Sequence, residues 1–153
     1  MRALAPILAG LMVIALPAAA QDAASAKAFL TALYASYHGD GPDIFGKQAS
    51  KVFSPRLRGL IRRDRELAHG EVGALDGDPV CNCQDFEIKD VSVEATLKGP
   101  GLAQATAKFR NFGKPEVVRL DLVAGAGGWR IDNIHEDGTP DLAAYLAKHA
   151  GGR

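Results

Sequence analysis

The sequence predicts one α+β domain, with helices in its first half and an antiparallel sheet in its second half. Apolar residues before residue 70 recur at helical spacing, those after residue 86 alternate with polar ones, and short turns rich in Gly and Pro separate the alternating segments. Connections this short join antiparallel strands, so we expect a meander of about four strands. Helices packed on one face of a curved sheet would leave a concave interior open at one end, which is a common kind of ligand site.

The first 20 residues have the three parts of a Sec-type signal peptide. Arg2 is the single basic residue, an uncharged apolar stretch runs from Ala5 to Leu16, and the segment ends in Ala-Ala-Ala. The apolar stretch is shorter than the roughly 20 residues that cross a bilayer as a helix. No Cys lies near the cleavage site to carry a lipid. We therefore expect cleavage after Ala20, a periplasmic or secreted domain of residues 21–153, and no stable membrane anchor; the alternative is an N-terminal membrane anchor.

The charge of the remaining chain narrows the class of partner. Without the signal peptide, 17 basic and 18 acidic side chains remain. Nucleic acids and membrane surfaces attract proteins whose charge is strongly of one sign, so this balance argues against both. We expect the partner to be a small molecule or another periplasmic protein.

Two long helices and a short one are predicted in the first half. The first runs over 22–38, with an apolar face of Ala26, Phe29, Leu30, Leu33, Tyr34 and Tyr37. A short helix over 44–51 follows. The next helix is capped by Ser54, has Pro55 at its first position and ends at His69-Gly70. Its apolar face holds Leu57, Leu60 and Ile61.

The second half predicts strands from residue 86 to about residue 131 and a C-terminal helix. Val91, Val93, Ala95 and Leu97 form one apolar row, whereas Phe86 and Ile88 have the opposite phase. The change of phase near Lys89-Asp90 predicts a β-bulge or a kink. Trp129 and Ile131 are expected in the core. The last helix opens at 139–141 and has Leu142, Tyr145 and Leu146 on its apolar face.

The loop from Gly70 to Asp85 joins the two halves and contains both cysteines and four acidic residues. An ordered loop of this length usually has a function. It could cover the end of the sheet, with Asp side chains accepting hydrogen bonds from backbone amides in tight turns. Alternatively, Asp76 and Asp78 could perform acid–base chemistry.

Cys81 and Cys83 are separated by one residue, and in an oxidising compartment a disulfide between them is the favoured state. In an extended chain their Cα atoms would lie about 6.5–7 Å apart, at the limit for a disulfide, so the bond requires a kinked backbone. Free or intermolecular thiols and a metal or redox site are the alternatives. A metal would need Asp76, Asp78 or a distant His as further ligands. We expect no resident metal and no cofactor.

The helix before this loop carries five arginines on its polar face: Arg56, Arg58, Arg62, Arg63 and Arg65. Such a run usually forms a solvated face. One or two of the arginines could instead hold Asp76, Asp78 or Asp85 in bidentate ion pairs. An anion or an acidic partner could also bind there, although a basic helix beside an acidic loop favours internal pairing.

Several strings resemble the bacterial domain-of-unknown-function family 3828. They are Val52-Phe53-Ser54-Pro55-Arg56-Leu57, the loop with Leu75-Asp76-x-Asp78-Pro79-x-Cys81-x-Cys83-Gln84-Asp85, Phe109-Arg110-Asn111-Phe112, and Gly128-Trp129-Arg130-Ile131-x-Asn133-Ile134. The resemblance spans residues 26–146. It implies a nuclear-transport-factor-2-like cone, in which a curved sheet surrounds helices, and an exported protein without an assigned activity. The superfamily includes isomerases and dehydratases, but their catalytic residues do not map onto this chain.

We therefore expect an exported, non-catalytic domain that binds a ligand or a protein. The candidate binding residues are Asp76, Asp78, Gln84, Asp85, Arg58 and Arg62. One alternative is a small enzyme of the cone-shaped isomerase or dehydratase type that uses an Asp in the cavity. This enzyme would need Asp76, Asp78, Asp85, His38 or Tyr37 to point into the cavity with a shifted pKa. A metal or redox module at Cys81 and Cys83 is the further alternative.

Overall fold

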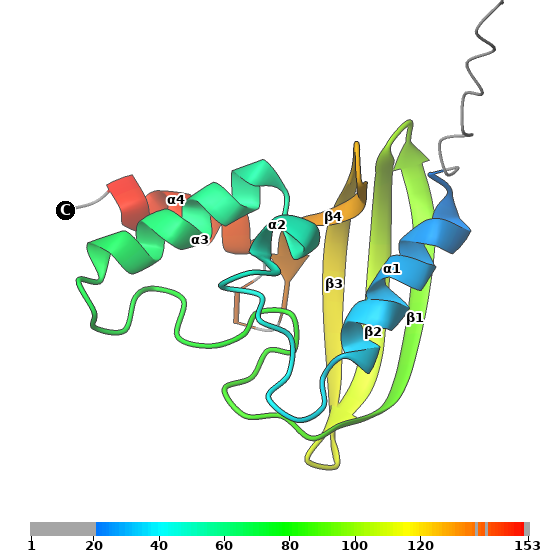
Figure 1. Cartoon of the computed structure of the whole chain (residues 1–153), viewed down its shortest axis with the longest axis horizontal. Coiled ribbons are helices and arrows are strands. Elements are labelled where there is room, and N and C mark those ends of the chain that lie inside the picture. The colour runs from blue at the N-terminus through cyan, green and yellow to red at the C-terminus, as the bar shows by residue number, and fades with distance from the viewer. Residues whose placement is uncertain (1–20, 137, 140, 152–153) are drawn as a thin grey trace, which may run out of the picture.

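A computed structural model describes residues 21–136, 138–139 and 141–151 (Figure 1). The predicted signal peptide lies outside these residues. Three helices come first: α1 (Ala23–Ala35), α2 (Ala49–Val52) and α3 (Pro55–Leu67). The strands β1 (Ile88–Gly99), β2 (Leu102–Asn111), β3 (Lys114–Gly125) and β4 (Gly128–His135) follow, and α4 (Leu142–Gly151) ends the fold. The predicted α+β class, with helices and a four-stranded antiparallel sheet, is confirmed.

The two long helices α1 and α3 begin at side-chain caps, and the cap of α3 is the one that was predicted. Asp22 and Ser25 form a capping box at the start of α1. Ser54 accepts a hydrogen bond from the amide of Leu57 at the start of α3. The short helix predicted over 44–51 is wrong in extent. Asp43 accepts the amide of Lys47 with its side chain, and the chain runs through turns as far as Gln48 before α2 begins.

The sheet is a simple meander in the order β1-β2-β3-β4 with antiparallel neighbours. The pairing of β1 with β2 shifts between Lys89 and Ser92, and Asp90 has a φ of 55°, which confirms the predicted irregularity. The predicted apolar row on β1 is buried near its middle and exposed at its ends. Val93 is buried, but Val91 is 38% and Leu97 43% exposed, since β1 is an edge strand and α1 is the helix that packs on it.

The core lies between one sheet face and the helices. In Figure 1, α1 crosses β1 and β2, whereas α2, α3 and α4 gather beside β4. Trp129 is buried, as predicted, and its indole Nε1 donates a hydrogen bond of 3.0 Å to Ser25 Oγ in α1. Inward-facing side chains such as Leu120 and Ile131 are fully buried, so packed side chains fill the sheet face where we expected a concave interior. The predicted apolar face of α4 is wrong at Tyr145, which is 37% exposed.

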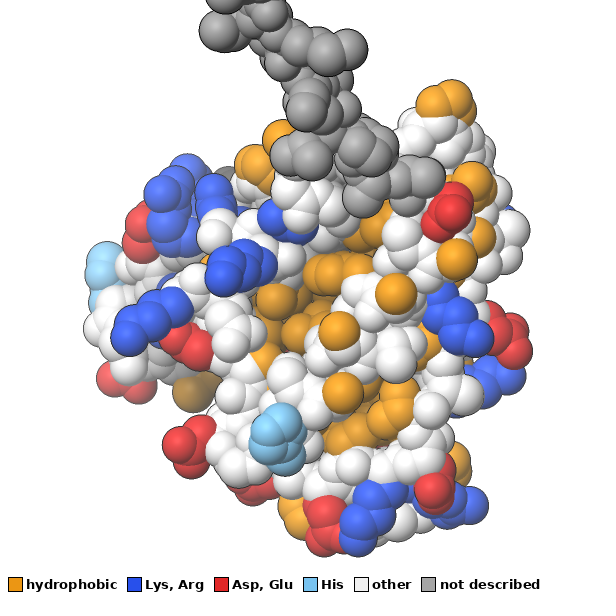
Figure 2. Space-filling view, turned by 45° about the vertical axis from the view of Figure 1, so that its right-hand side comes forward, with side chains coloured by type: hydrophobic (Ala, Val, Ile, Leu, Met, Phe, Trp, Pro, Cys, Tyr) orange, Lys and Arg blue, Asp and Glu red, His pale blue; other side chains and the backbone are white. Residues whose placement is uncertain are grey.

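The surface view in Figure 2 shows apolar side chains in a hollow near the middle of one face, with charged side chains mostly around it. No described helix combines the length and apolar character that a membrane span requires.

Candidate binding groove

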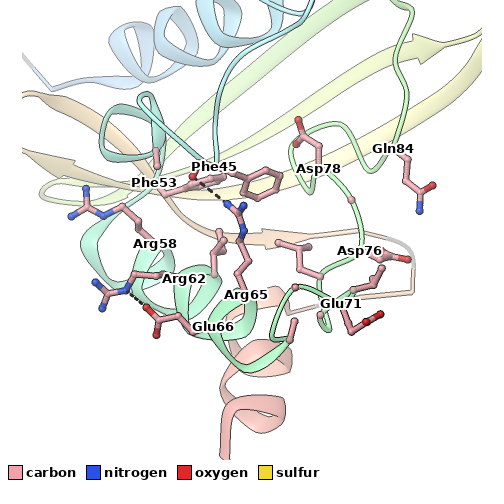
Figure 3. A pocket seen from close by; sticks show the side chains of 18 residues that line it. Phe45, Phe53, Arg58, Arg62, Arg65, Glu66, Glu71, Asp76, Asp78 and Gln84 are labelled. Carbon is pink, nitrogen blue, oxygen red and sulfur yellow. Dashed lines mark hydrogen bonds and ion pairs between the residues drawn. The ribbon is translucent and has the colours of Figure 1, made fainter.

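A groove of about 1020 Å³ lies between α3 and the loop that follows it (Figure 3). It brings together five of the six residues that the sequence singled out: Arg58, Arg62, Asp76, Asp78 and Gln84. Asp85 does not line it. The backbone carbonyl of Asp85 instead accepts a hydrogen bond of 3.1 Å from Asn111 Nδ2 at the end of β2. The groove therefore lies outside the sheet, between a helix and a loop that are adjacent in sequence.

One wall of the groove is basic and belongs to α3. Arg58, Arg62 and Arg65 all line it. Arg65 donates a hydrogen bond of 3.3 Å to the carbonyl of Phe45, and its guanidinium lies 5.5 Å from the centre of the Phe45 ring. Arg62 lies 3.5 Å from Glu66 on the same helix, with both side chains largely exposed. Arg58 has no ion-pair partner among the described residues.

The opposite wall is acidic and belongs to the loop, where Glu71, Asp76 and Asp78 line the groove (Figure 3). The expected ion pairs between the arginines of α3 and the loop are not present. Within the described part of the chain, no ion pair joins the two walls. Arg56 does hold an Asp, but that residue is Asp132 on β4, at 2.7 Å.

A buried Asp, rather than an Arg, fixes the loop to α3. Asp64 accepts hydrogen bonds from the amides of Ala74, at 2.9 Å, and Leu75, at 3.0 Å. Gly73 lies so close that a Cβ there would come within 2.3 Å of Asp64 Oδ2. Because the carboxylate satisfies two backbone amides at once, the loop needs no arginine to hold it. Sequence reasoning missed Asp64, which sits in an Arg-rich stretch that looks exposed.

The floor between the walls is apolar. Phe53 and Ile61 are buried beneath the groove, and Leu75 is partly buried. Two large apolar side chains at the groove remain in contact with solvent: Phe45 is 36% and Val72 75% exposed. An apolar centre bordered by charged side chains is the usual composition of a protein–protein interface.

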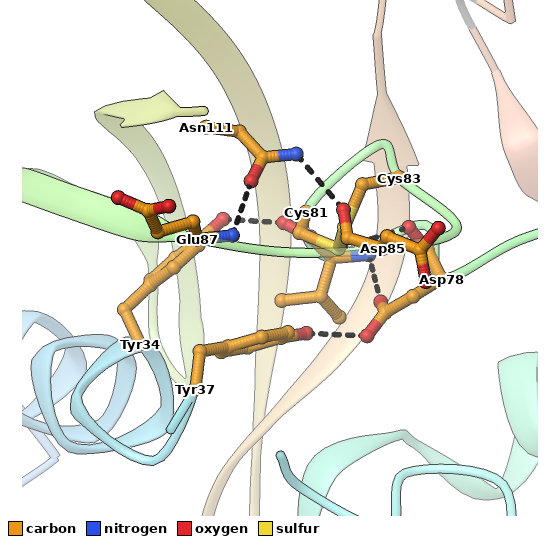
Figure 4. Close-up of a disulfide and its surroundings, with 9 residues drawn as sticks. Tyr34, Tyr37, Asp78, Cys81, Cys83, Asp85, Glu87 and Asn111 are labelled. Atoms are coloured by element: carbon orange, nitrogen blue, oxygen red, sulfur yellow. Dashed lines mark hydrogen bonds between the residues drawn. A yellow bond between two sulfur atoms is a disulfide. The ribbon is translucent and has the colours of Figure 1, made fainter. Parts of the chain in front are cut away.

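Cys81 and Cys83 are bonded to each other, as the sequence favoured, with their Cα atoms 5.2 Å apart (Figure 4). The necessary kink is present, since Asn82 has a φ of 50°. Asp78 and Cys83 exchange both backbone hydrogen bonds, at 2.7 and 3.1 Å, and so close a small hairpin around the disulfide. This bond leaves neither thiolate available to a metal. The described residues contain no group of three His, Cys, Asp or Glu side chains that could hold a metal ion.

Asp78 connects this hairpin to α1 (Figure 4). Its Oδ2 accepts a hydrogen bond of 2.6 Å from the hydroxyl of Tyr37, and its Oδ1 accepts one of 2.7 Å from the amide of Val80. Burial raises the pKa of Asp78, and burial together with the nearby carboxylate raises the pKa of Tyr37. Tyr34 adds a parallel contact, with its hydroxyl 2.6 Å from the carbonyl oxygen of Val80. Both Asp78 oxygens are therefore engaged in holding the hairpin.

Glu136, at the end of β4, is a second perturbed acid that the sequence did not reveal. Burial and the negative charges of Asp76 and Asp78 raise its pKa to about 7. Its Oε2 is buried without a hydrogen-bond partner among the described residues. Glu136 does not line the groove. His38, a candidate in the enzyme hypothesis, is exposed and contacts the carbonyl of Ala35 at the end of α1.

No family model matches the chain. The chain is 35% identical over 109 residues to the uncharacterized protein YqhG of Escherichia coli K12, a match that covers 67% of this chain. The chain spans only about a third of that relative, 35% of its length.

Two solved structures are similar to the fold. Both are crystal structures of the type VI effector–immunity complex Tae3–Tai3 from Ralstonia pickettii. One chain is 20% identical, with a TM-score of 0.49, over 74% of this chain and 92% of that one. The other is 17% identical, with a TM-score of 0.48, over 74% and 94%.

Proposed function

We propose that the chain is an exported, non-catalytic domain that binds its ligand or partner protein in the groove between α3 and the loop over 70–78. One observation carries this proposal: the two walls hold charges of opposite sign that are not paired with each other, above an apolar floor. Unpaired charges that face an open groove are available to an occupant, and they give its binding specificity and orientation.

Two features support export. The first residues after the expected cleavage site contact the fold: the Gln21 side chain donates to the carbonyl of Gly125, at 2.9 Å, and Asp22 caps α1. Cleavage after Ala20 would therefore leave these contacts intact. The disulfide between Cys81 and Cys83 fits an oxidising compartment.

The enzyme alternative is favoured by one observation. Asp78 lines the groove, is hydrogen-bonded to Tyr37 and has a raised pKa, as a general acid or base would. We place it second because each carboxylate oxygen of Asp78 already accepts a hydrogen bond from the protein. These two hydrogen bonds give Asp78 a structural role in the hairpin.

The proposal also includes the family to which the chain belongs. We infer membership of the family 3828 and of the nuclear-transport-factor-2-like superfamily from the quoted strings. The order of helices, four-strand meander and short final helix supports this assignment. An experimental structure superposed on members of that superfamily would test it, and a sheet without their curvature would overturn it.

Nuclear magnetic resonance of ¹⁵N-labelled protein tests the binding function. The probes are separate mixtures of amino acids, short peptides and sugars. We expect at least one mixture to shift the amide signals of residues 70–78 and of α3. The charge-reversed variants Arg58→Glu and Asp76→Lys should lose these shifts, whereas Arg63→Glu, on α3 but outside the groove, should retain them. If no mixture shifts the groove amides, the proposed site is wrong.

A further inference from the structure

We propose that the groove accepts an extended peptide segment of a partner protein, with an acidic and a basic side chain on either side of an apolar one. This inference rests on the proposed binding function and names the class of ligand. The segment's acidic side chain would lie against Arg58 and Arg62, and its basic side chain against Asp76 and Glu71. Its apolar side chain would cover the floor.

The charges of the walls select for a ligand that carries both signs. Arg58 has no ion-pair partner among the described residues, and Arg62 has only an exposed contact with Glu66. Their guanidinium groups are suited to bidentate recognition of a carboxylate. The acids across the groove would repel a nucleic acid or another polyanion, and the arginines would repel a polycation. A peptide with one charge of each sign complements both walls.

The openness of the groove favours a peptide over an enclosed small molecule. Small-molecule sites have volumes of roughly 300–1,000 Å³ and surround most of their ligand. This groove, at about 1020 Å³, reaches the top of that range, and its rim side chains Arg62, Glu71 and Val72 are exposed. A chain segment could enter and leave at the open side while its side chains contact both walls.

The exposed apolar and aromatic side chains have the composition of a protein-binding surface. Val72 is largely exposed although it is apolar, and Phe45 has one ring face beside the Arg65 guanidinium. Aromatic and Arg side chains are enriched among the residues that dominate binding energy at protein interfaces. Phe45 and Val72 would lose their remaining solvent contact when a segment covers them.

The acidic wall is also held in place before binding. Asp64 fixes the backbone at Ala74 and Leu75, and the disulfide hairpin fixes it at Asp78. A wall that is already ordered loses little conformational entropy when the ligand binds. This rigidity is useful for recognising a flexible peptide, which itself loses entropy on binding.

Four acetylated and amidated octapeptides test the inference. Each has a Leu-Phe centre, flanked by Glu and Lys, by Glu on both sides, by Lys on both sides, or by Ser on both sides. Titrations followed by calorimetry and by amide shifts should show that the mixed-charge peptide binds at least about tenfold more tightly than any other. Equal or tighter binding of a single-sign peptide or of the Ser peptide would overturn the inference.

Variants of the full chain locate the contacts. The double variant Arg58→Ala/Arg62→Ala and the single variant Asp76→Asn should each weaken binding of the mixed-charge peptide by about tenfold. Arg63→Ala, on the same helix but outside the groove, should bind as tightly as the unaltered protein. Thermal unfolding confirms that each variant is folded. The double variant Arg58→Glu/Arg62→Glu should prefer the peptide with two Lys, and unchanged preference would contradict the inference.

The failure of this inference can be told from the failure of the binding function. If amino acids or sugars shift the groove amides and none of the octapeptides does, the groove binds a small molecule and the peptide inference is wrong. If nothing shifts these amides, the binding function is wrong as well.

Discussion

The hydroxyl of Tyr37 donates a hydrogen bond of 2.6 Å to Asp78 Oδ2 and so joins the end of α1 to the disulfide hairpin. Asp78 uses its other oxygen to accept the amide of Val80. This one carboxylate thus orients the hairpin relative to the helix and, because Asp78 also lines the groove, sets the position of the acidic wall.

Tyr37→Phe should destabilise the protein by about 1–3 kcal/mol, because it leaves a buried carboxylate oxygen without its donor. Urea unfolding measures the change. Tyr34→Phe is the matched control: it leaves the buried carbonyl of Val80 without its donor and should cost less, because an unsatisfied neutral group is less costly than a charged one. A smaller effect of Tyr37→Phe than of Tyr34→Phe would contradict the role given to Asp78.

Reduction of the disulfide should loosen the acidic wall. Closure of so short a loop is expected to stabilise the fold by about 1–2 kcal/mol, and the variant Cys81→Ser/Cys83→Ser should lose that amount. The mass of the intact protein, measured with and without reductant, should rise by two hydrogens on reduction. An unchanged mass would show that the sulfurs are not bonded.

Asp64→Asn should release the loop from α3. The Asn side chain has one acceptor oxygen and places its NH₂ group toward a backbone amide, so at least one of the two bonds is lost, at a cost of about 1–3 kcal/mol. Hydrogen exchange at the amides of Ala74 and Leu75 should accelerate. Asp85→Asn, on the same loop but exposed, should change stability by no more than about 0.5 kcal/mol. Equal losses of stability in Asp64→Asn and Asp85→Asn would show that Asp64 does not hold the loop.

Stability should fall as the pH rises toward neutrality. Burial and nearby acids raise the pKa of Glu136 from 4.5 to about 7, so the folded protein holds a proton that the unfolded chain releases. Stability from this group is therefore complete below about pH 4.5 and lost as the pH rises through 7. Because the side chain is partly exposed, we expect a loss of only about 1 kcal/mol.

Glu136→Gln should remove the part of this fall that Glu136 causes, while Asp78, whose pKa burial also raises, still contributes. Glu94→Gln, on an exposed position of β1, should leave the fall unchanged. Urea unfolding between pH 4.5 and 8 provides the comparison. If the stability of Glu136→Gln falls by the same amount over this pH range, other groups cause the fall.

The exported protein should begin at Gln21. Expression of the full chain in a bacterium, followed by fractionation and mass measurement of the intact protein, checks this. We expect the cleaved form in the periplasm with its disulfide formed. Uncleaved protein in the membrane fraction would support the alternative of an N-terminal anchor.

Local signals accounted for the parts of the fold that were predicted correctly. Ser54 and Pro55 place the start of α3 because capping depends on neighbouring residues alone. The phase change at Lys89-Asp90 reveals a bulge because side chains alternate along a strand. Arg58 and Asp76 could be grouped in advance because the helix and loop that carry them are adjacent in the chain.

Contacts between distant segments could not be predicted. Which side chain of α3 would hold the loop depended on how the loop folds back, and the buried Asp64 took the part expected of the arginines. The raised pKa of Glu136 arises from burial and from acids about sixty positions earlier in the chain, Asp76 and Asp78. Val91 and Leu97 remain exposed although α1 packs on β1, and β1 lies at the edge of the sheet with a neighbouring strand on one side alone.

Trp129 is the only tryptophan of the chain, and it is buried against Ser25 in α1 without lining the groove. Its fluorescence therefore reports whether the first helix is docked on the sheet. A ligand in the groove should leave this emission nearly unchanged, and unfolding should move it to longer wavelength. In one sample, tryptophan fluorescence can thus follow folding while the amide shifts of the groove follow binding.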